Sequence, residues 1–171
     1  AIRSARLRGA ELNLGWASVL LAVQTLWRGQ PAEARELALG ALPRFASDRG
    51  NAGANALAVS AAAAWQLGDF QRAHAEAEQA LDVLERGPVL FQMWPSCDLV
   101  PDTLLLLWQQ ARERGLPSEA ALKKLIQRAL TQTRSLAFIA PIGKPLYLRA
   151  LGVLARLEGR PARAQKDLQQ A

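Results

Sequence analysis

Residues 68–73 read Gly-Asp-Phe-Gln-Arg-Ala, and this phrase decides the fold because it recurs along the chain. Related phrases are Gly-Gln-Pro-Ala-Glu-Ala at 29–34 and Gly-Arg-Pro-Ala-Arg-Ala at 159–164, with a weaker copy, Gly-Leu-Pro-Ser-Glu-Ala, at 115–120. Each copy has glycine first, phenylalanine or proline third and alanine sixth. The four glycines are 39, 47 and 44 residues apart. A fixed phrase at such intervals is typical of stacked helical repeats.

Helical patterns lie on both sides of each phrase. In the first, apolar residues recur at spacings of three and four along one helix face, as at Trp16, Val19 and Val23. Glycine suits the end of one helix, and proline suits the first turn of the next. The patterns predict eight helices, with breaks at Pro43, 48–53, 87–101 and 140–145. The expected helices span residues 10–28, 31–42, 54–67, 70–85, 102–114, 117–137, 146–158 and 161–171.

The composition indicates an all-α protein. Half of the 171 residues are apolar and 21% are charged, which is typical of an ordered chain. Alanine and leucine, both strong helix formers, dominate the apolar residues, whereas β-branched residues are few. We expect one helical-repeat domain over residues 1–171. Because the chain lacks an initial methionine and stops within a helical pattern, we expect it to be a fragment of a longer protein.

The chain carries a net charge of +6, and arginine greatly outnumbers lysine. The cations are spread along the sequence with acidic residues between them, which favours a solvated surface over a nucleic-acid site. The longest apolar stretches, 16–23 and 104–108, fall far short of the roughly 20 residues that a membrane-spanning helix needs. We therefore expect no membrane span. The interleaved charges favour a partner other than nucleic acid, and a single cysteine fits a cytoplasmic location.

Few residues suggest catalysis. Cys97 and His74 are the single residues of their types, so neither a disulfide framework nor a zinc cluster built on cysteine is expected. Residues 142–144 read Ile-Gly-Lys, but a phosphate-binding P-loop needs glycine where Phe138 stands and Ser or Thr where Pro145 stands. We expect no enzyme activity, no metal and no cofactor.

The phrase and its surroundings resemble the tetratricopeptide repeat (TPR). The turn glycines are Gly29, Gly68 and Gly159, and alanines occupy the closest helix contacts at positions 34, 73 and 164. Alanine-leucine pairs at 41–42 and 80–81 match the late pair of the second TPR helix. The resemblance implies an α-α superhelix of about four irregular TPR-like units. The third unit departs from the pattern, with Gln127 where alanine is expected.

Residues 138–161 are similar to a narrower group. These are the C-terminal helical repeats of large bacterial proteins that join a nucleotide-cyclase or kinase domain to a signalling ATPase domain. The resemblance implies a regulatory or interaction region in a signalling protein. A protein or peptide, or other domains of the same chain, would then be the partner.

In such a superhelix the first helix of each unit lines the concave face, and the repeat alignment predicts which residues point inward. Their side chains pass from an apolar end to a polar, basic end, which would suit an extended segment with an aliphatic anchor and a carboxylate. The predicted binding residues are Trp16, Val23, Trp27, Asn55, Ala62, Gln66, Asp102, Gln109, Arg149 and Arg156.

Three functions remain open from the sequence. The first is a non-catalytic scaffold that binds protein within a larger signalling protein. The second is a regulatory module that senses a small ligand and controls an attached ATPase or cyclase. The third, supported only by the positive charge, is a nucleic-acid-binding helical repeat, whose affinity would fall steeply with salt.

Overall fold

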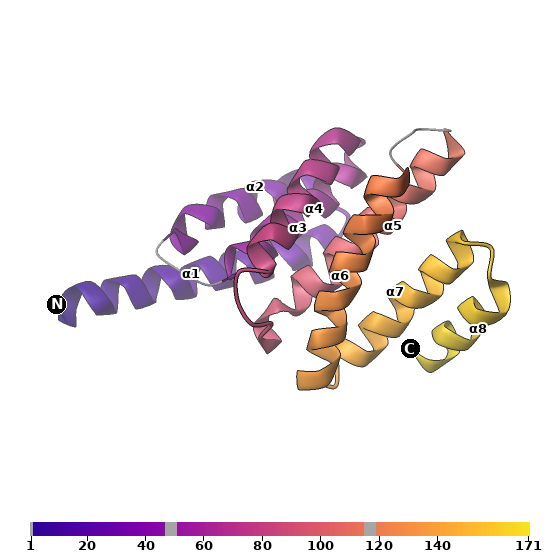
Figure 1. The fold of residues 1–171 in the computed structure, drawn as a ribbon. Helices are drawn as coiled ribbons and strands as arrows, with labels where there is room; N and C mark the ends of the chain where they lie inside the picture. Colours follow the sequence, from indigo (N-terminus) through magenta and orange to yellow (C-terminus); the bar gives the residue numbers. More distant parts are fainter. Residues whose placement is uncertain (1, 47–50, 115–118) are drawn as a thin grey trace. The chain divides into compact units, whose positions relative to one another are not determined.

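A computed structural model describes residues 2–46, 51–114 and 119–171 (Figure 1). These residues form α-helices and short 3-10 helices, with no strand among them. The expected all-α class is confirmed. The helices are α1 (Ile2–Trp27), α2 (Pro31–Ala41), α3 (Gly53–Gln66), α4 (Phe70–Leu84), α5 (Trp94–Glu113), α6 (Glu119–Ile139), α7 (Gly143–Leu157) and α8 (Pro161–Gln170), with 3-10 helices η1 (Leu42–Phe45) and η2 (Phe91–Met93).

The chain divides into two compact units. Unit 1 is Ala1–Gly87 and holds α1 to α4; unit 2 is Pro88–Ala171 and holds α5 to α8. In each unit every helix packs against the next one along the chain. The first and third helices of each unit, α1 with α3 and α5 with α7, also contact each other. The third helix of each unit therefore rests on both helices of the preceding hairpin.

The recurrent phrase forms the same turn three times. Gly29, Gly68 and Gly159 have φ angles of 77°, 81° and 74°, which only glycine adopts readily. Each glycine N–H donates to the carbonyl three residues back, and the next N–H donates to the carbonyl five residues back, as in a Schellman motif. The turn residue Asp69 also caps α4, because its carboxylate accepts from the Arg72 N–H at 3.2 Å. The first four residues of the weaker copy, 115–118, and part of the expected loop at 48–53 lie outside the described residues.

Alanine at the sixth position of the phrase lets paired helices approach closely. Ala34 and Ala73 are fully buried, and Ala164 is 5% exposed. Buried alanines continue along the same faces of α2 and α4. The largest fully buried side chains of unit 1 are leucines and valines, whereas unit 2 buries Trp108 among leucines. Of the five tryptophans, Trp108 is in the core and Trp27 is 62% exposed.

Three helix starts differ from the expected boundaries. Helix α1 begins at Ile2 and not at residue 10. The sequence predicted a break over 87–101, but α5 begins at Trp94 and contains Pro101. Likewise α7 begins at Gly143 and not at residue 146. Among the described residues, no helix is long and apolar enough to cross a membrane.

A hydroxyl from α6 explains how Pro101 fits inside a helix. Proline has no N–H, so the carbonyl of Cys97, four residues earlier, loses its helical donor. The Thr133 hydroxyl donates to this carbonyl at 2.8 Å, and it also lies 3.1 Å from the carbonyl of Ala129 on its own helix. Thr133 is fully buried. Its hydroxyl therefore satisfies a buried acceptor that the proline leaves unpaired.

Replacing Thr133 by valine is expected to destabilise the chain by about 1–2 kcal/mol, because the buried Cys97 carbonyl would lose its donor. Valine keeps the shape of threonine, so packing changes little. The matched control is Thr131→Val on the same helix, since the Thr131 hydroxyl is exposed and bonds only its own helix, at 3.0 Å from the Gln127 carbonyl. Urea unfolding would compare the two variants, and equal effects would contradict this role of Thr133.

Candidate binding groove

Six of the predicted binding residues lie in unit 1, on α1 and α3, and the structure gives them different surroundings. Val23 and Asn55 are in the core and Ala62 is 9% exposed. Trp27 and Gln66 are exposed. Trp16 is half-buried and meets the Phe45 ring edge to face, with ring centres 5.7 Å apart. Val23, Asn55 and Ala62 are buried because α1 and α3 contact each other directly.

The other four predicted residues lie in unit 2, where α5 and α7 bring them together in two pairs. In the first pair, the Arg149 guanidinium of α7 lies 2.8 Å from the Asp102 carboxylate of α5. It also lies 2.5 Å from the carboxylate of Asp98, one turn earlier on α5. One cation thus holds two carboxylates, and this acidic triad carries a net charge of −1 when both are ionised.

Burial opposes ionisation in the triad. It raises the pKa of Asp102 to about 6, an effect that the Asp98 charge reinforces and the Arg149 charge only partly offsets. Burial also raises the pKa of Asp98 above its usual range, against the attraction of Arg149. A single guanidinium faces two partly desolvated carboxylates. Protonation of one of these carboxylates is therefore favoured. The triad can therefore hold α5 against α7 with a strength that depends on pH.

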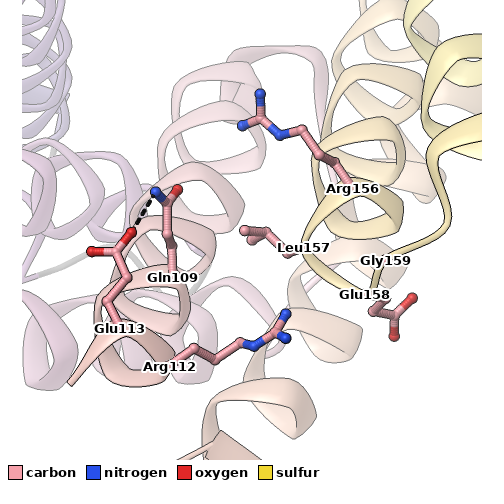
Figure 2. Close-up of a pocket in the computed structure, with 7 residues that line it drawn as sticks. All are labelled: Gln109, Arg112, Glu113, Arg156, Leu157, Glu158 and Gly159. Carbon is pink, nitrogen blue, oxygen red and sulfur yellow. Dashed lines mark hydrogen bonds between the residues drawn. The ribbon is translucent and has the colours of Figure 1, made fainter. Parts of the chain in front are cut away.

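The second pair, Gln109 and Arg156, borders an open groove of about 680 Å³ (Figure 2). Each lies seven residues beyond a member of the first pair, which is two helical turns or about 10 Å along the axis. Arg112 and Arg156 extend into the groove from opposite helices, with Leu157 between them (Figure 2). The remaining lining residues are Glu113, Glu158 and Gly159.

Charges in the groove are unequally matched. Glu113 accepts a hydrogen bond from the Gln109 amide at 2.9 Å, and Glu158 pairs with Arg160. Arg112 lies over the Trp108 ring, 5.6 Å from its centre, in a cation–π contact. For Arg156, no ion pair is seen within the described part of unit 2. Two turns after Asp102 and Arg149, the corresponding positions hold the neutral Gln109 and Arg156, so no carboxylate takes the place of Asp102 there. The Arg156 guanidinium is therefore available to an external anion.

Sequence reasoning missed Asp98, Arg112 and Glu113. The expected helix began at Asp102, so Asp98 fell in a presumed break and its relation to Asp102 was not visible. With α5 starting at Trp94, residues 98, 102, 109 and 113 follow one face of the helix. The i, i+4 spacing of the two aspartates was the signal that could have found the triad.

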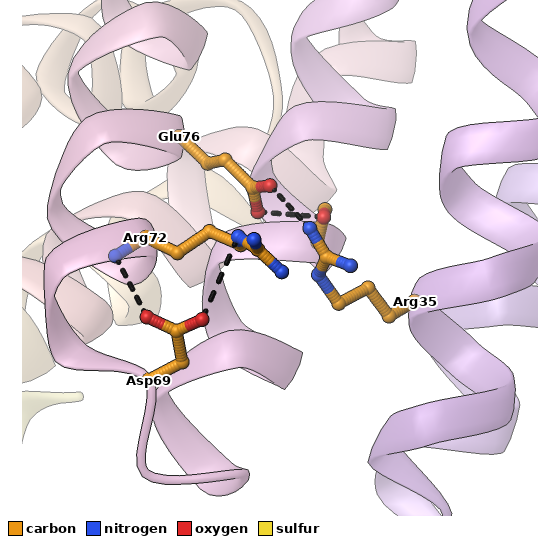
Figure 3. Close-up of polar contacts among 5 residues, drawn as sticks. Arg35, Asp69, Arg72 and Glu76 are labelled. Carbon is orange, nitrogen blue, oxygen red and sulfur yellow. Dashed lines mark hydrogen bonds and ion pairs between the residues drawn. The ribbon is translucent and has the colours of Figure 1, made fainter.

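A second polar cluster, in unit 1, joins three helices (Figure 3). The Glu76 carboxylate of α4 lies 2.7 Å from the Arg35 guanidinium of α2 and accepts from the Ser60 hydroxyl of α3 at 2.6 Å. Asp69 and Arg72 pair nearby, at 3.5 Å, across the start of α4. Since the Glu76 side chain is only 14% exposed and bonded on both oxygens, this cluster serves as a brace between helices.

The residues that were considered for catalysis or phosphate binding have structural roles. Cys97 is fully buried, and burial raises its pKa to about 12, so its thiol stays protonated at neutral pH. The N–H groups of Gly143 and Lys144 donate to carbonyls of the preceding turn, at 3.0 and 3.3 Å, and so do not form a phosphate cradle. In the described ranges, no three His, Cys, Asp or Glu side chains gather in a way that could hold a metal ion.

Because comparison with known proteins finds no match, the function is inferred from the fold and the groove. No known family model matches the chain, and no curated protein matches it significantly.

Proposed function

We propose that the chain is a non-catalytic, TPR-like helical-repeat scaffold that binds an extended protein segment in the groove between α5 and α7. The single observation that carries the proposal is the available Arg156 guanidinium. It faces Arg112 across an open groove between α5 and α7, which are the first helices of the two hairpins in unit 2. The three equivalent glycine turns support the repeat assignment. A superhelix built from about four such helix-turn-helix repeats would expose the first helix of each repeat to a partner.

The groove suits a segment with a carboxylate and an aliphatic side chain. Arg156 can bind a carboxylate through two parallel N–H donors, and Arg112 adds a second positive charge. Leu157 offers an apolar contact beside them. Gln109 can turn its amide toward a peptide backbone once it releases Glu113. An acidic segment of another protein, or of another domain in the same longer chain, would meet these requirements.

The wider setting rests on the resemblance of residues 138–161 to repeats of bacterial signalling proteins. We propose that the partner contact regulates a larger cytoplasmic protein with an ATPase, cyclase or kinase domain. Expressing the full-length protein and testing nucleotide turnover with and without mutations in the groove would examine this setting.

Replacing Arg156 by alanine is expected to weaken peptide binding about tenfold, equivalent to about 1.4 kcal/mol, because an exposed bidentate contact is lost. The probe is a fluorescent peptide selected from a library of acidic, leucine-containing sequences, measured by anisotropy. The matched control is Lys166→Ala, which removes an exposed cation of α8 outside the groove. Equal losses in the two variants, or no selected peptide at all, would contradict the proposal.

A small-ligand sensor is the second candidate, favoured by the groove volume. About 680 Å³ falls within the range of small-molecule sites. The sensor hypothesis expects a small dicarboxylate or phosphate compound to raise the melting temperature of the wild-type chain and not that of Arg156→Ala. A peptide effect without any small-anion effect would favour the scaffold.

A further inference from the structure

The positive charge of the chain is concentrated in one segment of unit 2. Between Glu119 and Glu158 lie 38 residues with seven lysines and arginines and no acidic residue. The rest of the chain has 14 basic and 15 acidic residues. The net charge of +6 therefore comes entirely from the segment that forms most of α6, the turn after it and α7.

An apolar surface lies at the end of unit 2 where α6 passes into α7. Phe138 and Ile139 are the last two residues of α6, and their side chains are 80% and 55% exposed. Ile142, in the turn that follows, is 40% exposed. Leu90 and Phe91, at the start of η2, are 47% and 57% exposed. We call these five residues the apolar end.

The contacts of α5 and α6 place both parts of the apolar end together. The two helices form a hairpin and run in opposite directions (Figure 1), and Thr133 bonds the carbonyl of Cys97. Residues that precede Cys97 consequently lie beside residues that follow Thr133. The direct packing of η2 against α6 agrees with this arrangement.

Cations flank the apolar end. Arg134, an exposed residue one turn before Phe138, holds its guanidinium 5.9 Å from the centre of the Phe138 ring. Lys144 is exposed in the first turn of α7. Asp98 and Asp102 of α5 are bound to Arg149. Within the described part of unit 2, no ion pair of Arg134 or Lys144 is seen. Exposed aromatic and aliphatic groups thus share one surface with uncompensated positive charge.

We propose that the apolar end docks unit 2 onto an anionic lipid bilayer. Phenylalanine and isoleucine enter the boundary of the hydrocarbon, and Arg134 and Lys144 contact the headgroups. This mode needs no spanning helix. Charge complementarity selects an anionic bilayer over an apolar protein surface, which would leave both cations without partners. A small apolar insertion binds weakly by itself, so both contributions are needed.

Vesicle sedimentation tests the proposal. The chain is mixed at 0.1 M salt with phosphatidylcholine vesicles or with vesicles that contain 30% phosphatidylserine. We expect binding only with phosphatidylserine. The double variant Phe138→Ser/Ile142→Ser and the single variant Lys144→Glu are each expected to lower the partition coefficient at least fivefold. The matched control is Leu14→Ser/Leu21→Ser, which removes two exposed apolar residues of α1 in unit 1 and should bind as wild type.

A second measurement reports insertion directly. Because Cys97 is buried, Ile139→Cys can be labelled selectively with a polarity-sensitive dye, whose emission should shift to shorter wavelength on anionic vesicles. Binding that Lys144→Glu abolishes but the double serine variant does not, with no dye shift, would overturn the proposal in favour of charge attraction alone. Absence of vesicle binding, or equal loss in the α1 control, would also overturn it. These outcomes are independent of the peptide groove, which Arg156→Ala tests.

Discussion

Replacing Gly143 by alanine is expected to destabilise the chain by about 3 kcal/mol, the upper part of the range for overpacking. A Cβ atom at position 143 would lie 2.5 Å from the backbone nitrogen of Ala137 and 2.5 Å from the carbonyl carbon of Leu136. Both atoms belong to the backbone of α6, which cannot rotate away as a side chain can. The start of α7 would have to move from the end of α6.

Gly40 provides the matched control because it also lies within a helix, but no heavy atom lies within 4 Å of an added Cβ. Gly40→Ala should leave stability unchanged or raise it by up to about 1 kcal/mol, since alanine favours the helix. Thermal and urea unfolding of both variants would separate the two effects. A Gly143→Ala chain as stable as wild type would contradict the close backbone approach.

Replacing Arg149 by alanine is expected to cost about 2 kcal/mol at pH 7, because Asp98 and Asp102 would stay partly buried without their cation. The cost is smaller than that of breaking a fully buried pair because the Arg149 side chain is 41% exposed. The control is Arg72→Ala, which breaks an exposed pair with Asp69 at 3.5 Å and should cost less than about 0.5 kcal/mol. Chemical unfolding would show the difference, and equal costs would contradict the role of the triad.

The same triad predicts a pH dependence with a defined sign. The pKa of Asp102 is about 6 in the folded chain and about 4 when unfolded. Between these values the folded chain binds more protons, so the contribution of Asp102 to stability is full below about pH 4 and is lost as pH rises through about 6. Asp102→Asn removes this loss. It should therefore be about 1 kcal/mol more stable than wild type at pH 7 and equal at pH 4.

Unfolding curves at pH 4, 5, 6 and 7 would test this sign. In Arg149→Ala, the pKa values of both aspartates should rise further, so the variant should lose most stability near neutral pH and least near pH 4. A wild-type chain whose advantage over Asp102→Asn grows with pH would contradict the burial of this carboxylate.

Helix existence was readable from the sequence, but the starts of α1, α5 and α7 were not. Pro101 suggested a break because proline removes a helical hydrogen bond. Thr133, 32 residues later, satisfies the freed carbonyl, and only the tertiary structure brings the two together. Gly143 similarly resembled part of a loop motif, although its role is to let two backbones touch.

The repeat alignment assigned Asp102, Gln109, Arg149 and Arg156 to the inward face without pairing them. In the structure Asp102 lies with Arg149, whereas Gln109 and Arg156 line one groove. The alignment did not separate exposed from buried positions in unit 1. Val23, Asn55 and Trp27 were all assigned to one inward face, yet the first two are buried and Trp27 is exposed. Burial depends on which neighbouring helices cover a position, and spacing along one helix does not contain that information.

The sequence alone determined the all-α class and the three tight turns, because glycine, proline and alanine impose local backbone geometry and close helix contacts wherever they occur. Tertiary structure decided which charges are neutralised. Arg149 and Arg156 lie seven residues apart on α7, but the first pairs with two carboxylates, whereas the second lines an open groove and has no ion pair within the described part of unit 2. Electrostatic interactions depend on distances between segments far apart in sequence, and only the packing of α5, α6 and α7 sets those distances.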